Sequence, residues 1–536
     1  MFEKIWNSIR RIIAQMTGKK NIEEVLHVLP VVSTKMEQSI KLWDDMYKGQ
    51  AEWLHEPTIA NPIDISSLGL AASIASEKAR TATLEMQSRI TDPAESTADK
   101  IVDMTEDFVP LNRAEYLNKQ YQLYLLPHIR RQLEYGIAKG GLVIKPYIYD
   151  NDKIHFSFCQ ADDFYPISFD PTGRMTEAAF TEVRIQQKIK YTRLEYHKLD
   201  VKNKTVTVVN KAFRTMYSDA MTSDALGTEV PLSTLADWAT ISPSTTINNV
   251  DRLLFAYFKM PEANTIDPKS PLGVSGYSRC VSLIKEADLQ FSRLKWEYDG
   301  GQLAVDVDGD ALKTAEVTVD GKLTRVELPN VLQKRLFRKM DLGTDQTYNV
   351  YAPALRDASY INGLNNILMR IEDTAGISRG TFSDITRSEA KTATELLVMR
   401  QRTYSSNCEI QKALQAALED VVYVMNVYAT IFSLAPEGPY QTSYEWDDSL
   451  INNPEEELQR RIVMLSKGLE SKVNIRMWYF GETKEQAMAA LMQIEEEQMR
   501  NAEMQAIATG LVQQQKPQNE PNNKEPSKNQ PSNEPK

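Results

Sequence analysis

The 536-residue sequence contains only three cysteines, and they are far apart, at Cys159, Cys280 and Cys408. An odd, scattered set predicts no disulfide framework and is typical of a reducing compartment. Long apolar runs are also missing, because no segment reaches the roughly 18–20 residues that a membrane span needs. Residues 1–16 are amphipathic and lack the continuous apolar core of a signal peptide. We therefore expect a protein that is made in the cytosol and does not span a membrane.

The chain has no excess of positive charge. It carries 73 acidic and 62 basic residues, which gives a formal net charge of −11. Proteins that hold nucleic acid over a large surface are normally basic. Any contact with DNA is therefore expected to be local or loose.

Motifs for catalysis and metal binding are missing as well. No Walker A or Rossmann glycine pattern is present, and His55-Glu56 lacks the second histidine of a zinc protease. The acidic segment 306–310 looks like the start of a calcium loop, but Ala311 and Val317 occupy the sixth and twelfth positions, so a turn is expected instead. The histidines show no ligand spacing; they lie at positions 27, 55, 128, 155 and 197. The sequence predicts no enzyme, no cofactor and no metal site.

The most informative segment consists of two helical patterns around a short polar loop, residues 359–432. The first pattern has an apolar stripe at helical spacing and ends at Gly376. The loop GISRGTFSDIT follows, and Thr386-Arg387-Ser388-Glu389 predicts the capped start of a second helix. That helix continues to about Phe432 and would be roughly 70 Å long, with a bend expected at the weak helix formers of residues 403–407. A helix of this length without a sustained heptad repeat favours a large assembly.

The N-terminal part predicts an α+β domain over about residues 60–255. Helices are expected at 22–48, 70–90 and 112–135. A hairpin is expected at 142–149 and 153–158, followed by antiparallel strands at 179–190, 192–199 and 205–209, with a turn at 170–173 and a surface loop at 215–250. The amphipathic segment 1–16 fits a helix docked on a protein better than one lying on a membrane, although both remain open.

A second helical pattern, residues 277–299, has a narrow apolar seam. It ends at Gly300-Gly301, and short strands follow at 316–319 and 323–328 around the turn Asp320-Gly321. A helix leads away from the domain, a small β module follows, and a second helix returns. This order predicts a stalk of two helices with the β module at its end. Further helices are expected at 455–467 and 483–509, and the polar tail 513–536 is expected to be disordered.

The order of these parts, together with Gly380-Thr381-Phe382-Ser383 and Lys391-Thr392-Ala393-Thr394-Glu395, resembles the portal proteins of tailed double-stranded DNA bacteriophages. The resemblance covers about residues 20–510 and is closest to long-tailed phages of Gram-positive hosts. It implies an α+β, mainly helical fold with the following parts: an N-terminal helical segment (1–59), wing (60–270), stem helix (271–300), clip (301–356), second stem helix (357–375), tunnel loop (376–391), spine helix (392–440), helical crown (441–512) and tail (513–536).

By the same resemblance, the chain forms a homo-oligomeric ring, expected to have twelve subunits, at one vertex of the virion capsid. Assembly takes place in the host cytoplasm, with the major capsid and scaffolding proteins as partners. The terminase large subunit drives double-stranded DNA through the ring, head-completion or adaptor proteins then dock, and the genome later leaves by the same channel. No cofactor and no membrane contact are implied.

The resemblance also assigns roles to particular residues. The tunnel loop that faces DNA would include Ser378, Arg379, Thr381, Ser383, Asp384, Arg387 and Lys391. The subunit-packing stem would include Val281, Ile284, Phe291, Leu294, Leu364, Ile367 and Leu368. The clip would bind partners through Lys334, Arg335, Arg338 and Lys339, which fits a partner-facing surface better than a DNA site. Basic loop residues would meet either phosphates or acidic groups of adjacent loops.

Two other functions remain open from sequence. One is a membrane-associated or cytosolic scaffold built on the amphipathic N-terminal helix. The other is a nucleic-acid enzyme whose site is assembled only in three dimensions. Ring formation separates the portal from both, and metal-dependent nuclease or ATPase activity would identify the enzyme.

Overall fold

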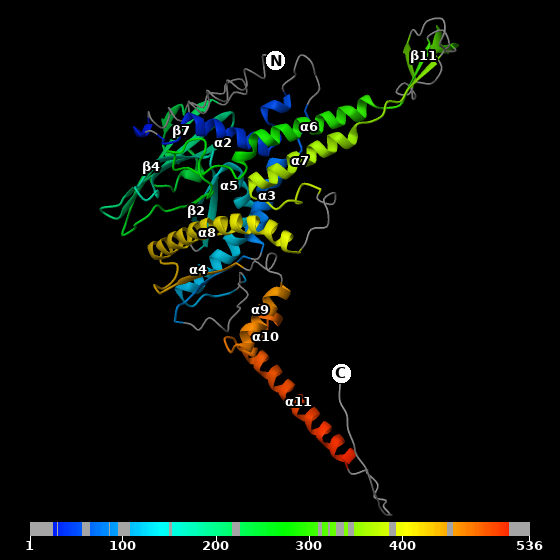
Figure 1. Cartoon of the computed structure of the whole chain (residues 1–536). Helices are drawn as coiled ribbons and strands as arrows, with labels where there is room; N and C mark the ends of the chain where they lie inside the picture. Colours follow the sequence, from blue (N-terminus) through cyan, green and yellow to red (C-terminus); the bar gives the residue numbers. More distant parts are fainter. Residues whose placement is uncertain are drawn as a thin grey trace, which may run out of the picture. The chain divides into compact units, whose positions relative to one another are not determined.

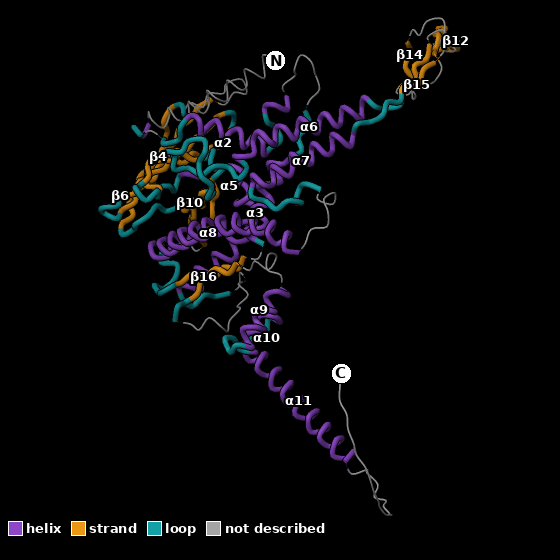
Figure 2. The backbone as a smooth tube through the Cα atoms, in the orientation of Figure 1, coloured by secondary structure: helices purple, strands orange, loops and turns teal. Residues whose placement is uncertain are grey.

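A computed structural model defines the fold for most of the chain (Figures 1 and 2). It describes residues 25–28, 30–55, 65–84, 86–94, 105, 108–149, 153–216, 226–308, 314–319, 322–327, 337–340, 348–384, 393–446 and 454–513. The predictions for residues 1–16, for the turns at 150–152 and 320–321, for the cap at 386–389 and for the tail beyond Gln513 lie outside these ranges.

The chain is a mixed α and β protein with 47% helical and 24% strand residues, which confirms the expected α+β class. It divides into two compact units, Met1–Asp447 and Asp448–Lys536. The elements of each unit are described separately below.

A group of packed helices forms the centre of the first unit. Its members are α2 (Thr34–Tyr47), α3 (Leu70–Thr83), α4 (Arg113–Gln120), α5 (Leu126–Lys139) and α8 (Ala393–Ile431). A π-helical turn, Tyr121–Leu125, joins α4 to α5, so the helical prediction for 112–135 is confirmed with one wide turn in its middle. The facing apolar side chains of α3, α5 and α8 share the largest hydrophobic core. Fully buried members of this core include Ile74, Leu133 and Leu414.

Glycine is required where α5 ends. Gly140 has a φ of 88°, and a Cβ added there would lie 2.8 Å from the carbonyl oxygen of Gly273. Both the left-handed backbone and the close approach exclude a larger residue. The chain can therefore pass directly from α5 into the first strand of the neighbouring sheet.

That sheet has three antiparallel strands in the order β10 (Ala256–Lys259), β2 (Gly141–Tyr149) and β3 (Lys153–Gln160). The β2–β3 pair confirms the predicted hairpin. Strand β2 is central in the sheet, and α5 and α8 both contact it.

A larger sheet contains β4 (Phe164–Phe169), β5 (Met175–Gln186), β6 (Ile189–Asp200), β7 (Thr205–Met216), β8 (Thr228–Val230) and β9 (Ser244–Asn248). Its long strands β5, β6 and β7 pair antiparallel and confirm that three strands follow one another here. Strands β6 and β7 are longer than predicted, whereas β5 begins four residues earlier than the predicted strand 179–190 and ends at Gln186. The predicted turn at 170–173 is also confirmed, because the Gly173 N–H donates to the Asp170 carbonyl at 3.0 Å.

The surface loop predicted for 215–250 is wrong where β8 and β9 both pair with β7. Leu232, Leu235 and Trp238 between these strands are buried and form a small core of their own with Ala212. The segment is rich in Ser, Thr and Asp, so its composition indicated a loop. Pairing with a long neighbouring strand outweighs that local preference.

Two helix predictions near the N-terminus also need correction. A helix was expected over residues 22–48, but α2 begins only at Thr34. Its start is capped by Ser33, whose hydroxyl accepts from the Met36 N–H. The helix expected over 70–90 ends at Thr83. Its last residues, from Met86, belong to β1 (Met86–Thr91), which pairs antiparallel with β16 (Gln441–Trp446). The partner strand is remote in sequence, so local periodicity could not reveal it.

A small β module lies between two helices in the sequence, as expected. Helix α6 (Val281–Gly300) leads into the module and α7 (Asp357–Ala375) returns from it, and the two helices pack together (Figure 1). The module contains a sheet of β14 (Phe337–Met340), β11 (Ala304–Asp308) and β15 (Tyr348–Tyr351), and a hairpin of β12 (Thr314–Val319) and β13 (Lys322–Glu327). The turn predicted at 306–310 is wrong for residues 306–308, which lie in β11. Asp306 and Val307 pair with strands on both sides, and Asp308 pairs with β14.

Helix α8 is continuous over 39 residues and confirms the predicted long helix. It runs without interruption through residues 403–407, where weak helix formers had indicated a bend. Arg113 holds the end of α8 and the segment after it. Its buried guanidinium donates to the carbonyls of Ala435 and Pro436 at 2.9 Å and of Asn426 at 3.2 Å.

We expect Arg113→Lys to destabilise the first unit by about 2 kcal/mol, because one ammonium cannot replace a guanidinium fork that serves three carbonyls. Urea unfolding of the full chain measures this loss. Arg130→Lys, an exposed position on α5, is the matched control and should change stability little. Equal stability of both variants would show that the three hydrogen bonds contribute nothing net.

The second unit contains α9 (Pro454–Ser466), α10 (Lys472–Phe480) and α11 (Lys484–Gln513). Helices α9 and α11 confirm the predictions for 455–467 and 483–509. Helix α10 was missed, because its β-branched and aromatic residues have low helix propensity. It begins at Ser471, whose hydroxyl accepts from the Asn474 N–H at 3.1 Å, and ends at Gly481, with a φ of 66°.

Candidate functional site

The segment between α7 and α8 is described over residues 376–384, here named the 376–384 loop. It begins at Gly376, which has a φ of 71° and whose N–H donates to the Glu372 carbonyl. The Ile377 N–H donates to the same carbonyl at 2.9 Å. This left-handed ending is the usual use of glycine after a helix. It turns the chain back along the last turn of α7.

A single buried carboxylate organises this loop. Glu372 lies in the last turn of α7, and its side chain is fully buried. Its Oε1 accepts from the N–H groups of Phe382 at 2.6 Å and Ser383 at 2.8 Å. Its Oε2 accepts from the Ser383 hydroxyl at 2.6 Å and the Gly380 N–H at 3.2 Å. Four donors of one loop therefore surround one carboxylate.

Further contacts fix the two ends of the loop. Asn365 of α7 makes a reciprocal pair with the Asp384 backbone, accepting from its N–H at 2.7 Å and donating to its carbonyl at 3.0 Å. On the other side, the hydroxyls of Ser378 and Thr403 of α8 lie 2.7 Å apart. The loop is thus bonded to both helices that it connects.

The predicted loop residues differ in what they present to solvent. Arg379, Thr381 and Asp384 are exposed and Ser378 is half-buried. Ser383 is buried and uses its hydroxyl on Glu372, so in this conformation it holds the loop and does not present a surface for DNA. Arg387 and Lys391 lie outside the described residues.

Arg379 is paired within its own chain. Its guanidinium binds the Asp373 carboxylate through two contacts, Nε to Oδ1 at 3.0 Å and Nη2 to Oδ2 at 2.5 Å. Hydrogen bonding and attraction to Asp373 raise the pKa of Arg379. From the sequence, the possible partners of Arg379 were a DNA phosphate or an acidic group of an adjacent loop. The structure adds Asp373 of the same chain as a third partner. An exposed pair of this kind exchanges readily for another anion.

The predicted stem residues mostly contribute to the core of their own chain. Ile284 and Leu294 are buried, with 3% and 8% exposure. The others are half-buried, and all of them except Phe291 pack against the largest core: Val281, Phe291, Leu364, Ile367 and Leu368. Helices α6 and α7 also pack against each other within the chain, and the role of these residues between subunits stays a prediction. On α6 the exposed apolar residues are instead Trp296 and Tyr298.

The predicted basic residues of the β module are only partly placed. Lys334 and Arg335 lie outside the described residues. Arg338 and Lys339 lie in β14, level with Asp306 and Val307 of the parallel strand β11. The register therefore sets a basic residue beside an acidic one in adjacent strands.

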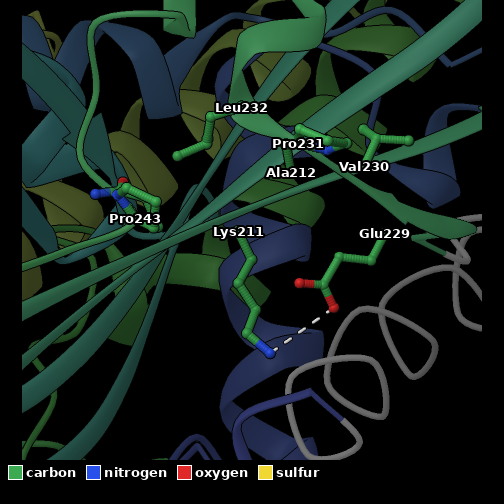
Figure 3. A pocket seen from close by; sticks show the side chains of 8 residues that line it. Lys211, Ala212, Glu229, Val230, Pro231, Leu232 and Pro243 are labelled. Carbon is green, nitrogen blue, oxygen red and sulfur yellow. Dashed lines mark ion pairs between the residues drawn. The ribbon is translucent and has the colours of Figure 1, made fainter.

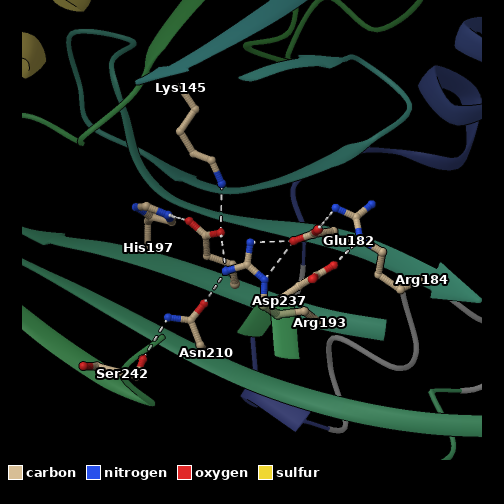
Figure 4. Close-up of polar contacts among 9 residues, drawn as sticks. Lys145, Glu182, Arg184, Arg193, His197, Asn210, Asp237 and Ser242 are labelled. Carbon is tan, nitrogen blue, oxygen red and sulfur yellow. Dashed lines mark hydrogen bonds and ion pairs between the residues drawn. The ribbon is translucent and has the colours of Figure 1, made fainter. Parts of the chain in front are cut away.

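A second group of charged residues, unmarked in the sequence, links the two sheets of the first unit (Figure 4). Glu195 of β6 is at its centre and binds Lys145 of β2 at 2.8 Å, Arg193 at 3.1 Å and His197 at 2.6 Å. Burial alone would raise the pKa of Glu195, but attraction to Lys145 and Arg193 and the contact with His197 outweigh it and hold the pKa well below its usual range. Residues 193, 195 and 197 share one face of a strand, so period-two spacing was the available signal.

This group borders a cavity of about 270 Å³ whose lining includes Lys145, Cys159, Phe180 and Arg193. Burial raises the pKa of the Cys159 thiol to about 11, so the thiol stays protonated near neutral pH and is a poor nucleophile. A second hollow of about 370 Å³ lies at β7 and β8, where Lys211 and Glu229 are 3.9 Å apart (Figure 3). Neither arrangement pairs a nucleophile with a base.

The described residues contain no group of three or more His, Cys, Asp or Glu side chains placed to hold a metal ion. Among them there is also no helix long and apolar enough to cross a membrane.

Comparison with known protein families identifies the chain. The model for SPP1 Gp6-like phage portal proteins matches residues 98–504, which is more than half of the sequence. The chain belongs to this family of phage portal proteins. No curated protein matches it.

Membership confirms the resemblance to tailed-phage portals seen in the sequence. A portal protein of this family implies a homo-oligomeric ring at a vertex of the virion capsid, associated with DNA. The matched region contains the α6–module–α7 segment, the 376–384 loop and α8. These parts of the portal protein thus belong to the region that the family shares.

Proposed function

We propose that this portal protein forms a ring of twelve subunits with a central channel. The terminase large subunit packages double-stranded DNA through the channel, and the genome later leaves by it. Head-completion or adaptor proteins dock on the ring, and the major capsid and scaffolding proteins surround it during assembly in the host cytoplasm. The observation that carries the proposal is the family match over residues 98–504. The role is structural and not enzymatic.

The elements suggest how the parts are used. We assign α6 and α7 to the stem, the β module at 301–356 to the clip, α8 to the spine helix, and 60–270 to the wing. Because β16 pairs with β1 of the first unit, the crown would comprise the helices after it, α9 to α11. The clip would offer Lys334, Arg335, Arg338 and Lys339 to docking proteins.

The 376–384 loop, with residues up to 391, would be the tunnel loop. Its described exposed residues Arg379, Thr381 and Asp384 are polar and would meet DNA weakly. A net charge of −11 supports transit, because a strongly basic channel would bind phosphates and retain DNA. Arg379 would exchange Asp373 for a passing phosphate.

Negative-stain imaging of the purified full chain tests the ring. We expect closed rings with a central channel and averages with twelvefold symmetry. Light scattering on the same sample should give the mass of twelve chains. Monomers or dimers under every assembly condition would contradict the proposal.

A further inference from the structure

The 376–384 loop joins two helices and contains two glycines, so its sequence indicates a flexible connection. The structure differs, because both glycines serve a defined shape. Gly376 and Gly380 have φ values of 71° and 92°, and the N–H of each donates to Glu372, one to its backbone carbonyl and the other to its carboxylate. Proline at either position would remove a donor and could not adopt the angle. A variant with proline at both positions would therefore lose the fold of the loop, and its behaviour could not report on the flexibility of the loop.

Glu372 is unusual among the residues of α7. It follows Leu368 by one helical turn, and so it lies on the apolar stripe that packs into the core. A charged residue there is costly unless hydrogen bonds compensate it. The compensation comes entirely from the loop, through the N–H groups of Gly380, Phe382 and Ser383 and the Ser383 hydroxyl.

We infer that Glu372 is a positioning residue that locks the 376–384 loop onto α7, so that the loop and α7 move as one body. The inference rests on the proposed function in assigning this loop to the channel. Asn365 at the far end and Thr403 on α8 complete the attachment. The exposed side chains Arg379, Thr381 and Asp384 then have a height and direction set by α7. A displacement of α7 would carry them toward or away from the DNA.

The chemistry of the four hydrogen bonds allows a sharp test, Glu372→Gln. The amide keeps the size of the carboxyl group, but one of its two ends becomes a donor. If the NH₂ replaces Oε1, it faces the N–H groups of Phe382 and Ser383; if it replaces Oε2, it faces the Gly380 N–H. The Ser383 hydroxyl can rotate to accept, but the backbone N–H groups cannot. With the NH₂ at Oε1, the buried Ser383 N–H and the Phe382 N–H lose their acceptor. With the NH₂ at Oε2, the Gly380 N–H loses the side chain of residue 372 and keeps only the Ser383 hydroxyl, at 3.1 Å. In both orientations the remaining hydrogen bonds lose the charge of the carboxylate and become weaker.

The first measurement is hydrogen–deuterium exchange of the full-length protein, followed by mass spectrometry of peptides covering 376–384. In Glu372→Gln the protected amides of this loop should exchange about tenfold to a hundredfold faster than in the wild type. Asp373→Asn is the matched control, since it makes the same chemical change at the neighbouring position, where the carboxylate binds Arg379. Ser383→Ala removes one of the four bonds to Glu372 and the bond from the Gly380 N–H to the Ser383 hydroxyl, but keeps the carboxylate. It should give a smaller increase and serves if Glu372→Gln does not fold.

The second measurement is DNA packaging and retention in heads assembled with each variant. Faster exchange together with impaired packaging or retention in Glu372→Gln rings, and neither change in Asp373→Asn, is the expected result. Unchanged exchange would overturn the lock. Faster exchange with normal DNA handling would overturn the link between loop position and DNA. Failure of the proposed function is separate, because the wild-type chain would then form no ring.

Discussion

Ile284→Asp is expected to unfold the packing between α6 and α7, and not merely to separate subunits. Ile284 is 3% exposed and belongs to the largest core of its own chain. Burying an unpaired carboxylate there should cost about 4 kcal/mol or more. Because whole domains are stable by only about 5–15 kcal/mol, much of the first unit's stability would be lost.

Urea unfolding of dilute full-length protein, followed by far-UV circular dichroism, measures this effect. Ser282→Asp, which adds the same charge at an exposed position two residues earlier, is the control and should keep the fold. A folded Ile284→Asp chain that fails only in ring assembly would restore the interpretation made from sequence, in which Ile284 faces a neighbouring subunit. If Ile284→Asp unfolds the chain as expected, Trp296, at 56% exposure on the same helix, is the better place to look for a subunit contact.

A second large effect is expected from Glu195→Gln at neutral pH. The substitution leaves Lys145 and Arg193 without their shared carboxylate, and their side chains are only 15% and 14% exposed. Removing one partner of a buried ion pair typically costs about 3–5 kcal/mol. Glu182 still pairs with Arg193 at 2.7 Å, so Lys145 bears most of the loss.

The pH dependence of this variant has a definite sign. The pKa of Glu195 is held below its ordinary value of 4.5 in the folded protein, chiefly because Lys145, His197 and Arg193 overcome the opposing effect of burial. Its stabilising contribution is therefore complete above pH 4.5 and is lost as the pH falls through the folded pKa. The stability difference between wild type and Glu195→Gln should be largest near pH 7 and should shrink below pH 4.5.

Urea titrations at several pH values test this behaviour. Glu229→Gln is the control on the same sheet, because its contact with Lys211 is 3.9 Å long and exposed and should contribute little at any pH. A difference for Glu195→Gln that did not change with pH would mean that its charge does not stabilise the fold.

The sequence determined the elements whose signals are local. The seam of 277–299 and the stripe of 359–375 predicted α6 and α7 because helical periodicity needs only neighbouring residues. Gly376 marked a helix end, since few other residues adopt a left-handed backbone. The hairpin at β2 and β3 was equally readable from alternation and its turn residues. The resemblance to portal proteins was carried by the same local segments together with their order.

Only the tertiary structure decided which faces these elements bury and which distant segments they meet. Strand β1 was taken for helix because β16, its hydrogen-bonding partner, lies at the other end of the unit's sequence. Ile284 and Leu294 face the chain's own core, a choice that periodicity cannot make between a neighbour in the chain and a neighbour in a ring. Glu372 and Glu195 read as ordinary acidic residues until their donors, brought from other elements, surround them. A buried charge is tolerated only where folding supplies its partners, and that supply is a property of the assembled structure.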